Sequence, residues 1–182
     1  LWALAAMWGF GAAMTAEFGV RDWLRQRPLA TLISHAWIVP FIDWFAVSAD
    51  VLGNDASYPP GVAWLVGVSL FGGMTVEIGR KIWAPEAERP GVESYSGQWG
   101  RRYATGVWGG VLIASLACGL VVLFRAEAWP LAPLLIAAAS VALGIGASAL
   151  MSPEAKSGRR VELAAGLWTL GLYFTIGPLV LL

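Results

Sequence analysis

The chain has 182 residues, of which 58% are hydrophobic and 13% are charged, and its formal net charge is zero. A soluble domain is about a quarter charged, so this composition predicts a membrane protein and excludes an ordinary water-soluble domain. Zero net charge gives no electrostatic case for binding nucleic acid, and a single cysteine, Cys118, excludes both a disulfide framework and a Cys/His metal cluster.

Long apolar runs predict the fold. A bilayer core needs about 20 mostly apolar residues per helix, and six stretches qualify, at about 1–19, 29–48, 61–80, 103–124, 130–150 and 163–181. The segments between them contain charged residues, proline and asparagine, which is typical of loops. We therefore predict an all-α, polytopic membrane bundle with six transmembrane helices, forming a single membrane domain over residues 1–182.

The distribution of basic residues predicts the orientation of these spans. Of the twelve Lys and Arg residues, all but Arg125 fall in the first, third and fifth connections. Lys and Arg accumulate on the cytoplasmic side of a membrane, so these three connections are expected to face the cytoplasm. Leu1 already lies inside an apolar run, with no Met and no basic leader before it, and we interpret the chain as a piece that lacks its beginning.

One dense polar segment, residues 77–102, contains the candidate metal ligands. Glu77 closes the third predicted span, and Pro85 and Pro90 forbid a continuous helix, so the loop can fold back over the helix end. Mg²⁺ is typically held by one or two carboxylates together with water and substrate phosphates. The candidate Mg²⁺ ligands are Glu77, Glu86 and Glu88.

The same segment contains five bases that are suited to phosphate. At helical spacing Arg80 and Lys81 share a face with Glu77, and cations at this place would stabilise the charge on a leaving diphosphate. The candidate diphosphate-binding residues are Arg80, Lys81, Arg89, Arg101 and Arg102. The alternative is that these bases only set topology and contact anionic lipid head groups. The interleaved acids argue against that alternative, because acids contribute little to orientation.

Two ionisable residues, His35 and Asp43, lie within the second predicted span. Charge inside a membrane is costly and indicates a functional site by default, so we expect both to border a substrate cavity, together with Tyr95 of the polar segment. The alternatives are a structural histidine and an aspartate that only bonds a neighbouring helix. Glu17 precedes Arg21 by four residues, which predicts an interfacial ion pair between them.

The polar segment resembles the second acidic motif of the UbiA-type intramembrane polyprenyl transferases, in a bacterial branch of that family. The resemblance rests on Glu-Ile-Gly-Arg-Lys-Ile at 77–82, Ala-Pro-Glu at 84–86 and Pro-Gly-Val-Glu-Ser-Tyr-Ser at 90–96. Further support comes from residues 34–35, 40–43 and 162–169. The resemblance covers the whole chain, although the usual motif is built on Asp where glutamates stand here, with Lys81 where an acid is common.

The resemblance implies a bundle of eight or nine spans with two acidic motifs at the cytoplasmic face. The six predicted spans align with spans four to nine, which implies three spans and the first motif upstream of Leu1 and no catalysis by this piece alone. It further implies a transferase of the bacterial inner membrane that uses Mg²⁺ to ionise a polyprenyl diphosphate. The prenyl group then passes to an acceptor, often an aromatic ring.

Two other functions stay open at this point. One is a small transporter or permease in which His35, Asp43 and Glu77 mark an ion path, although no internal repeat joins residues 1–90 to 91–182. The other is a catalytically degenerate family member that binds lipid without turnover. Metal-dependent binding of a diphosphate without transfer would identify the second.

Overall fold

The computed structural model describes residues 2–54, 57–58, 61–89, 92–152 and 154–177, and among these residues it contains helices joined by short turns and irregular connections, with no strand. The helices are α1 (Trp2–Thr15), α2 (Arg21–Arg25), α3 (Pro28–Ala36), α4 (Ile38–Gly53), α5 (Val62–Arg80), α6 (Tyr95–Trp99), α7 (Arg101–Arg125), α8 (Ala132–Met151) and α9 (Ala155–Ile176). Short 3₁₀ turns lie at η1 (Glu17–Gly19), η2 (Pro85–Ala87) and η3 (Trp129–Leu131). The predicted all-α class is confirmed.

Four helical segments among the described residues are long and apolar enough to cross a membrane, which supports a membrane protein. They are Pro28–Gly53 (α3 with α4), Val62–Arg80, Arg101–Arg125 and Trp129–Met151. All four coincide with predicted spans. The other two predicted spans differ: α1 has only 14 residues, against the about 20 that a bilayer requires, and α9 carries charged side chains near its start. A count of six spans is therefore not confirmed.

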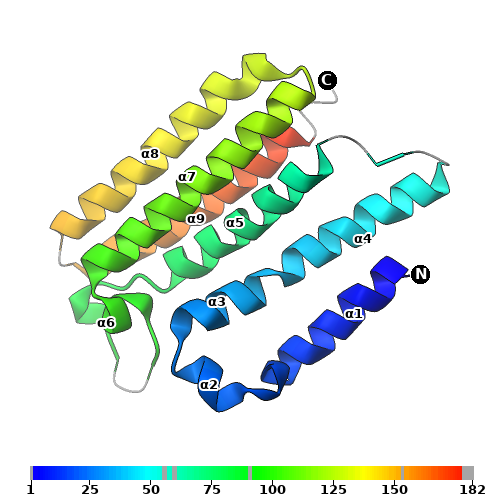
Figure 1. Ribbon diagram of the computed structural model, residues 1–182. Coiled ribbons are helices and arrows are strands. Elements are labelled where there is room, and N and C mark those ends of the chain that lie inside the picture. The colour runs from blue at the N-terminus through cyan, green and yellow to red at the C-terminus, as the bar shows by residue number, and fades with distance from the viewer. Residues whose placement is uncertain (1, 55–56, 59–60, 90–91, 153, 178–182) are drawn as a thin grey trace.

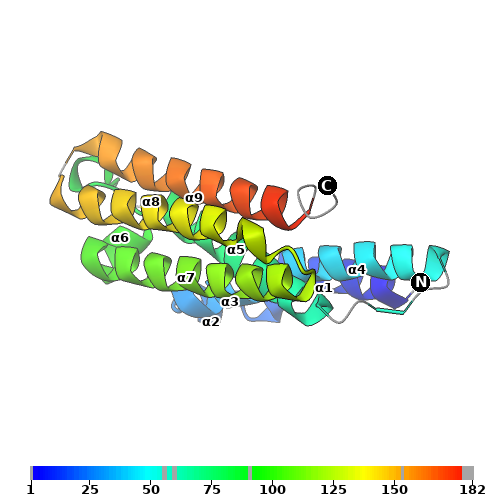
Figure 2. The ribbon, with the colours of Figure 1, turned by 90° about the horizontal axis from the view of Figure 1, so that it is seen from above.

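The long helices form a bundle with a helical pair beside it (Figure 1). Within the bundle, α5 packs against α7 and α9, and α8 packs against α7 and α9, whereas α4 packs against α1 and α5. Figure 2 shows the bundle from above as two layers, with α1 and α4 extending to one side. The short helices α2, α3 and α6 gather at one end, and α1 begins and α9 ends toward the other.

Two close approaches fix the end of α5 and the following loop against α9. A Cβ on Gly79 would lie 2.7 Å from the Cβ of Ala165, and a Cβ on Gly158 would lie 2.8 Å from the carbonyl oxygen of Ile82. Real Cβ atoms essentially never come this close, so glycine is required at both positions unless the backbone shifts. The polar segment therefore begins at a helix end that is tightly packed against α9.

Two buried tryptophans reinforce the same packing from α7 and α9. The indole N–H of Trp108 donates to the carbonyl of Thr75 at 3.1 Å, and that of Trp168 donates to the hydroxyl of Ser115 at 2.9 Å. Each ring fills a large apolar volume, while its one polar atom has a partner. These two hydrogen-bonded tryptophans therefore fix how the helices pack beneath the polar segment.

Candidate functional site

The polar segment folds back over the end of α5, as Pro85 predicted, whereas Pro90, the other proline of that prediction, lies outside the described residues. The backbone N–H of Tyr95 donates to the carbonyl of Lys81 at 3.0 Å. The carboxylate of Glu88 accepts hydrogen bonds from the hydroxyls of Ser94 at 2.6 Å and Ser96 at 2.7 Å. These contacts bring residues 94–96 back beside Glu88 and Lys81 and fix Lys81 beside Tyr95.

Replacing Glu88 with alanine is expected to destabilise the protein by about 2 kcal/mol, because hydrogen bonds to a charged group contribute roughly 1.5–3 kcal/mol each and this carboxylate is partly exposed. Thermal unfolding in detergent micelles would measure the loss. The control is Glu86→Ala, which removes an exposed carboxylate from the same loop. Equal shifts in the two variants would show that the hydrogen bonds of Glu88 do not hold the loop.

A cavity of about 380 Å³ lies between α3, α5 and α6, at the end of the molecule where the polar segment folds. This volume falls in the usual range for small-molecule sites. Its lining consists of Thr31, Leu32, His35, Ala36, Val39, Gly73, Glu77, Arg80, Lys81 and Tyr95. The charged side chains come from the last turn of α5, and deeper along the helices the lining becomes apolar at Val39 and Gly73.

Glu77 forms two ion pairs in the wall of this cavity. Its carboxylate lies 2.5 Å from a guanidinium nitrogen of Arg80 and 2.9 Å from Nζ of Lys81. The predicted acid and two bases on one helical face are therefore present. Nζ of Lys81 also lies 5.5 Å from the ring centroid of Tyr95, within cation–π range. The cavity thus presents two cations and one anion at its mouth.

Tyr95 is buried, with 5% of its surface exposed, and its ring stacks on Trp99 at 4.5 Å between centroids. Burial raises the pKa of its phenol to about 12, and the negative charge of Glu77 adds to the increase. At neutral pH the phenol therefore keeps its proton. Tyr95 can donate a hydrogen bond to a bound anion but cannot serve as a base.

His35 lines the cavity and contacts Glu17, which sequence reasoning had paired with Arg21. Its Nδ1 lies 2.9 Å from the carbonyl oxygen of Thr31, and its Nε2 lies 3.6 Å from the carboxylate of Glu17. Glu17 and Phe18 have φ values of 52° and 53°, a left-handed conformation that costs L-residues about 1–2 kcal/mol each. The predicted Glu17–Arg21 pair is wrong, because this unusual turn directs Glu17 toward α3.

Asp43 lies outside the cavity lining and bonds a neighbouring helix, as the alternative for it proposed. Its carboxylate accepts a hydrogen bond from the hydroxyl of Ser69 on α5. Asp43 is four residues beyond Val39 on α4, and Ser69 is four residues before Gly73 on α5. The pair is therefore one helical turn deeper than the cavity floor, where it joins α4 to α5.

The other predicted diphosphate ligands do not reach the cavity. The guanidinium of Arg101 donates to the carbonyl of Ser152 at 2.7 Å and to the hydroxyl of Ser157 at 2.5 Å, which ties α7 to the end of α8 and the first turn of α9. Arg102 and Arg101 line a separate open surface pocket beside Trp99. Arg89 is exposed on the loop. The expected five-base site is thus reduced here to Arg80 and Lys81.

The three candidate metal ligands do not converge either. Glu77 is in the cavity, Glu88 accepts from two serines, and Glu86 is exposed. Over the described part of the chain, no three or more His, Cys, Asp or Glu side chains are placed to hold a metal ion together. The predicted three-glutamate ligand set does not fit this geometry. Of the three predicted glutamates, Glu77 is the one that lines the cavity.

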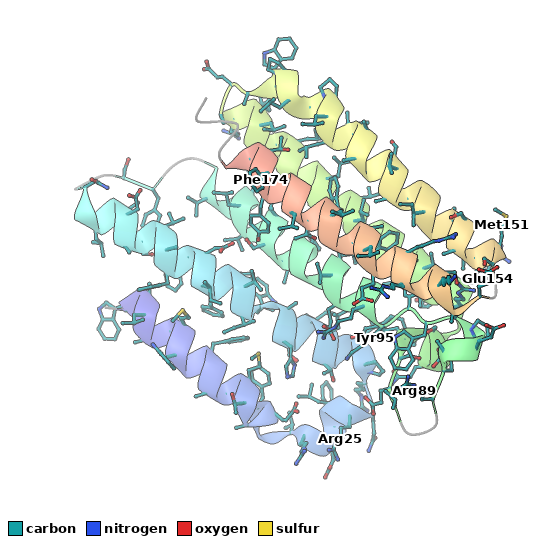
Figure 3. All side chains as sticks on the ribbon, turned by 180° about the vertical axis from the view of Figure 1, so that it is seen from behind. Arg25, Arg89, Tyr95, Met151, Glu154 and Phe174 are labelled. Atoms are coloured by element: carbon teal, nitrogen blue, oxygen red, sulfur yellow. The ribbon has the colours of Figure 1, made fainter. Side chains whose placement is uncertain are left out.

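Arg25 is a site residue that sequence reasoning missed. A pocket of about 70 Å³ adjoins the cavity, shares Lys81 and Tyr95 with it, and adds Arg25 from α2 and Glu93 from the loop. Figure 3 shows Arg25, Tyr95 and Arg89 at the same end of the molecule. The signal was the group of arginines before α3, but only the packing of α2 against α3, which lines the same pocket through Pro28 and Thr31, brings one of them near Lys81.

The geometry above comes from the described residues alone, and it leaves one cavity lined by two cations paired with the carboxylate of Glu77, by the imidazole of His35 and by the protonated phenol of Tyr95. Comparisons of the chain with protein-family models, with curated proteins and with solved structures found no match.

Proposed function

We propose that the protein is a membrane prenyl transferase of the UbiA type, which moves a prenyl group from its diphosphate to an acceptor. The observation that carries this proposal is the amphiphilic cavity, with Arg80 and Lys81 at its mouth and Val39 at its floor. A diphosphate requires cations, whereas a prenyl chain requires apolar surroundings. One cavity between α3 and α5 offers both in the expected order.

In this proposal the diphosphate binds Arg80 and Lys81, with Arg25 at the adjoining pocket and the phenol of Tyr95 as a further donor. These groups stabilise the charge that develops as the C–O bond breaks. Glu77 is the cavity carboxylate that would hold Mg²⁺, an ion that one or two carboxylates commonly bind together with substrate phosphates. The metal, when bound, adds positive charge to the leaving diphosphate.

The membrane arrangement belongs to the same proposal. α1 and α9 serve as fifth and sixth spans beside the four apolar ones, and the cavity mouth faces the cytoplasm of a bacterial inner membrane. All Lys and Arg residues except Arg125 occur in the connections at the motif end. In Figure 3 the labelled Arg25, Arg89 and Glu154 lie toward that end, and Phe174 lies at the other.

Binding of a donor analogue tests the proposal directly. Membranes containing the protein would be titrated with geranylgeranyl thiolodiphosphate, which resists ionisation, with and without Mg²⁺. Transfer would be followed with radiolabelled geranylgeranyl diphosphate and the lipids of the same membranes. We expect saturable binding that Mg²⁺ strengthens, together with transfer of label to another lipid. An absence of binding at millimolar analogue would overturn the proposal.

A second candidate, a diphosphate-lipid binder without turnover, is favoured by one observation. Glu77 is already neutralised by two cations, and the described residues provide no further carboxylate in the cavity. The same experiment separates the two functions. Analogue binding with no transfer of label would favour the binder.

A further inference from the structure

We propose that His35 accepts the proton that the acceptor loses on prenylation and that Glu17 stabilises the resulting imidazolium. This inference rests on the proposed function and assigns the acceptor to a class, a molecule that gives up a C–H or O–H proton when it is alkylated. It goes beyond cavity lining, because it gives the only histidine of the sequence a chemical step.

The contacts of His35 favour one tautomer. Its Nδ1 lies 2.9 Å from the carbonyl oxygen of Thr31 and 3.2 Å from the hydroxyl of Ser34, which itself donates to that carbonyl at 3.1 Å. Both partners therefore offer oxygen lone pairs to Nδ1, which favours the proton on that nitrogen. The lone pair of the neutral ring is then on Nε2. That nitrogen lies 3.6 Å from the carboxylate of Glu17, which favours the ring once Nε2 has gained a proton and become positive.

The other groups that face His35 cannot take the proton as readily. Glu77 is held by two cations at 2.5 and 2.9 Å, and Arg80 and Lys81 are themselves the positive partners in those pairs. The phenol of Tyr95 on α6 is protonated at neutral pH. Among the described residues of the cavity, His35 is therefore the base that is left.

The position of His35 suits this step. It lines the cavity from α3, whereas Glu77 and Arg80 line it from the last turn of α5, and it comes four residues before the apolar Val39. The deeper lining, at Val39 and Gly73, is apolar and fits the tail. An acceptor between the tail and α3 would have its reacting atom near both the allylic carbon and Nε2.

The step balances without any oxidant or reductant. The bond between the allylic carbon and oxygen breaks, and its electron pair leaves with the diphosphate. An electron pair of the acceptor forms the new bond to that carbon. The acceptor's C–H or O–H bond breaks, its proton passes to Nε2 of His35, and the electron pair of that bond stays with the acceptor. Glu17, whose side chain is 36% exposed, gives the proton a route to water.

The first test uses the fact that the sequence contains one histidine. Labelling with ¹⁵N-histidine gives one imidazole whose two nitrogen shifts report the tautomer. We expect the neutral ring to carry its proton on Nδ1, and we expect geranylgeranyl thiolodiphosphate to shift the Nε2 signal. A ring protonated on Nε2, or a signal that the analogue leaves unchanged while binding is saturated, would overturn the inference.

The second test is kinetic, in membranes that contain the intact protein. His35→Gln should lower transfer by about 100-fold or more and remove the acid limb of the pH–rate profile, with binding of geranylgeranyl thiolodiphosphate unchanged within about twofold. Glu17→Gln should lower transfer by about tenfold, since it removes only a supporting charge. The control for lost charge in this connection is Asp22→Asn, an exposed carboxylate on α2, with wild-type transfer expected.

The outcomes separate this inference from the function on which it rests. Wild-type protein that fails to bind the analogue or to transfer label would overturn both. Analogue binding and transfer by the wild type, with His35→Gln equally active, would overturn the inference alone. A His35→Gln variant that is folded but no longer binds the analogue would show a binding role and would also overturn it.

Discussion

Replacing Glu77 with alanine is expected to lower Mg²⁺-dependent prenyl transfer by about 100-fold or more, because it removes the one carboxylate of the predicted set that faces the cavity. The same change releases Arg80 and Lys81 from their ion pairs. Without Mg²⁺, geranylgeranyl thiolodiphosphate should therefore bind the variant at least as tightly as the wild type. Transfer rates and analogue Kd values, each measured against Mg²⁺ concentration, would check both parts.

The matched control is Glu86→Ala, which removes a carboxylate nine residues along the same segment. Glu86 is exposed and does not line the cavity, so its loss should change transfer by less than about twofold. Similar losses in the two variants would contradict the assignment of Glu77. A Glu77→Ala variant that keeps its full response to Mg²⁺ would remove the metal from the proposal.

Lys81→Met is expected to raise the Kd for geranylgeranyl thiolodiphosphate by about 10- to 150-fold, which corresponds to the roughly 1.5–3 kcal/mol of a hydrogen bond to a charged group. Methionine keeps much of the apolar stem that packs near Tyr95 but removes the ammonium group. Titration of the analogue at low and moderate salt would measure the change. The loss should shrink as salt increases, because salt screens the partly exposed charge.

Arg102→Gln is the informative comparison for Lys81. Both residues belong to the polar segment, and reasoning from the sequence assigned both to the diphosphate. Arg102 lines a separate pocket at the start of α7, so its replacement should change the Kd by less than about twofold. If both variants lose affinity equally, the diphosphate is not confined to the cavity beside α5.

Local spacing was enough to predict part of this site. Glu77, Arg80 and Lys81 lie on one turn of a continuous helix, and helical geometry alone places them together. The four apolar spans were predictable for a similar reason, since length and hydropathy are properties of the local sequence. The turn of the chain around Pro85 was also predictable, because a helix cannot continue through proline, although α5 already ends at Arg80.

Contacts that form only when the helices and loops pack were not predictable in the same way, whether the partners are distant or near in the sequence. Arg101 looked like a phosphate ligand by composition, but its guanidinium bonds residues more than fifty positions along the chain. The sequence suggested that Glu88 is a metal ligand, but its carboxylate accepts hydrogen bonds from two serines of the same loop. Glu17 reaches His35 only because η1 takes a left-handed turn that periodicity does not reveal.

The boundary between the helical bundle and the neighbouring pair α1 and α4 has a consequence for how a long lipid would enter the cavity. The charged residues of the cavity, Glu77, Arg80 and Lys81, all belong to the end of α5, which is locked against α9 through Gly79. The opposite wall belongs to α3 and α4, which contact the bundle chiefly along α5. Displacement of that wall would widen the cavity without breaking either ion pair. In the proposed function, the substrate would enter by movement of α3 and α4, whereas ionisation of its diphosphate would depend on residues at the end of α5.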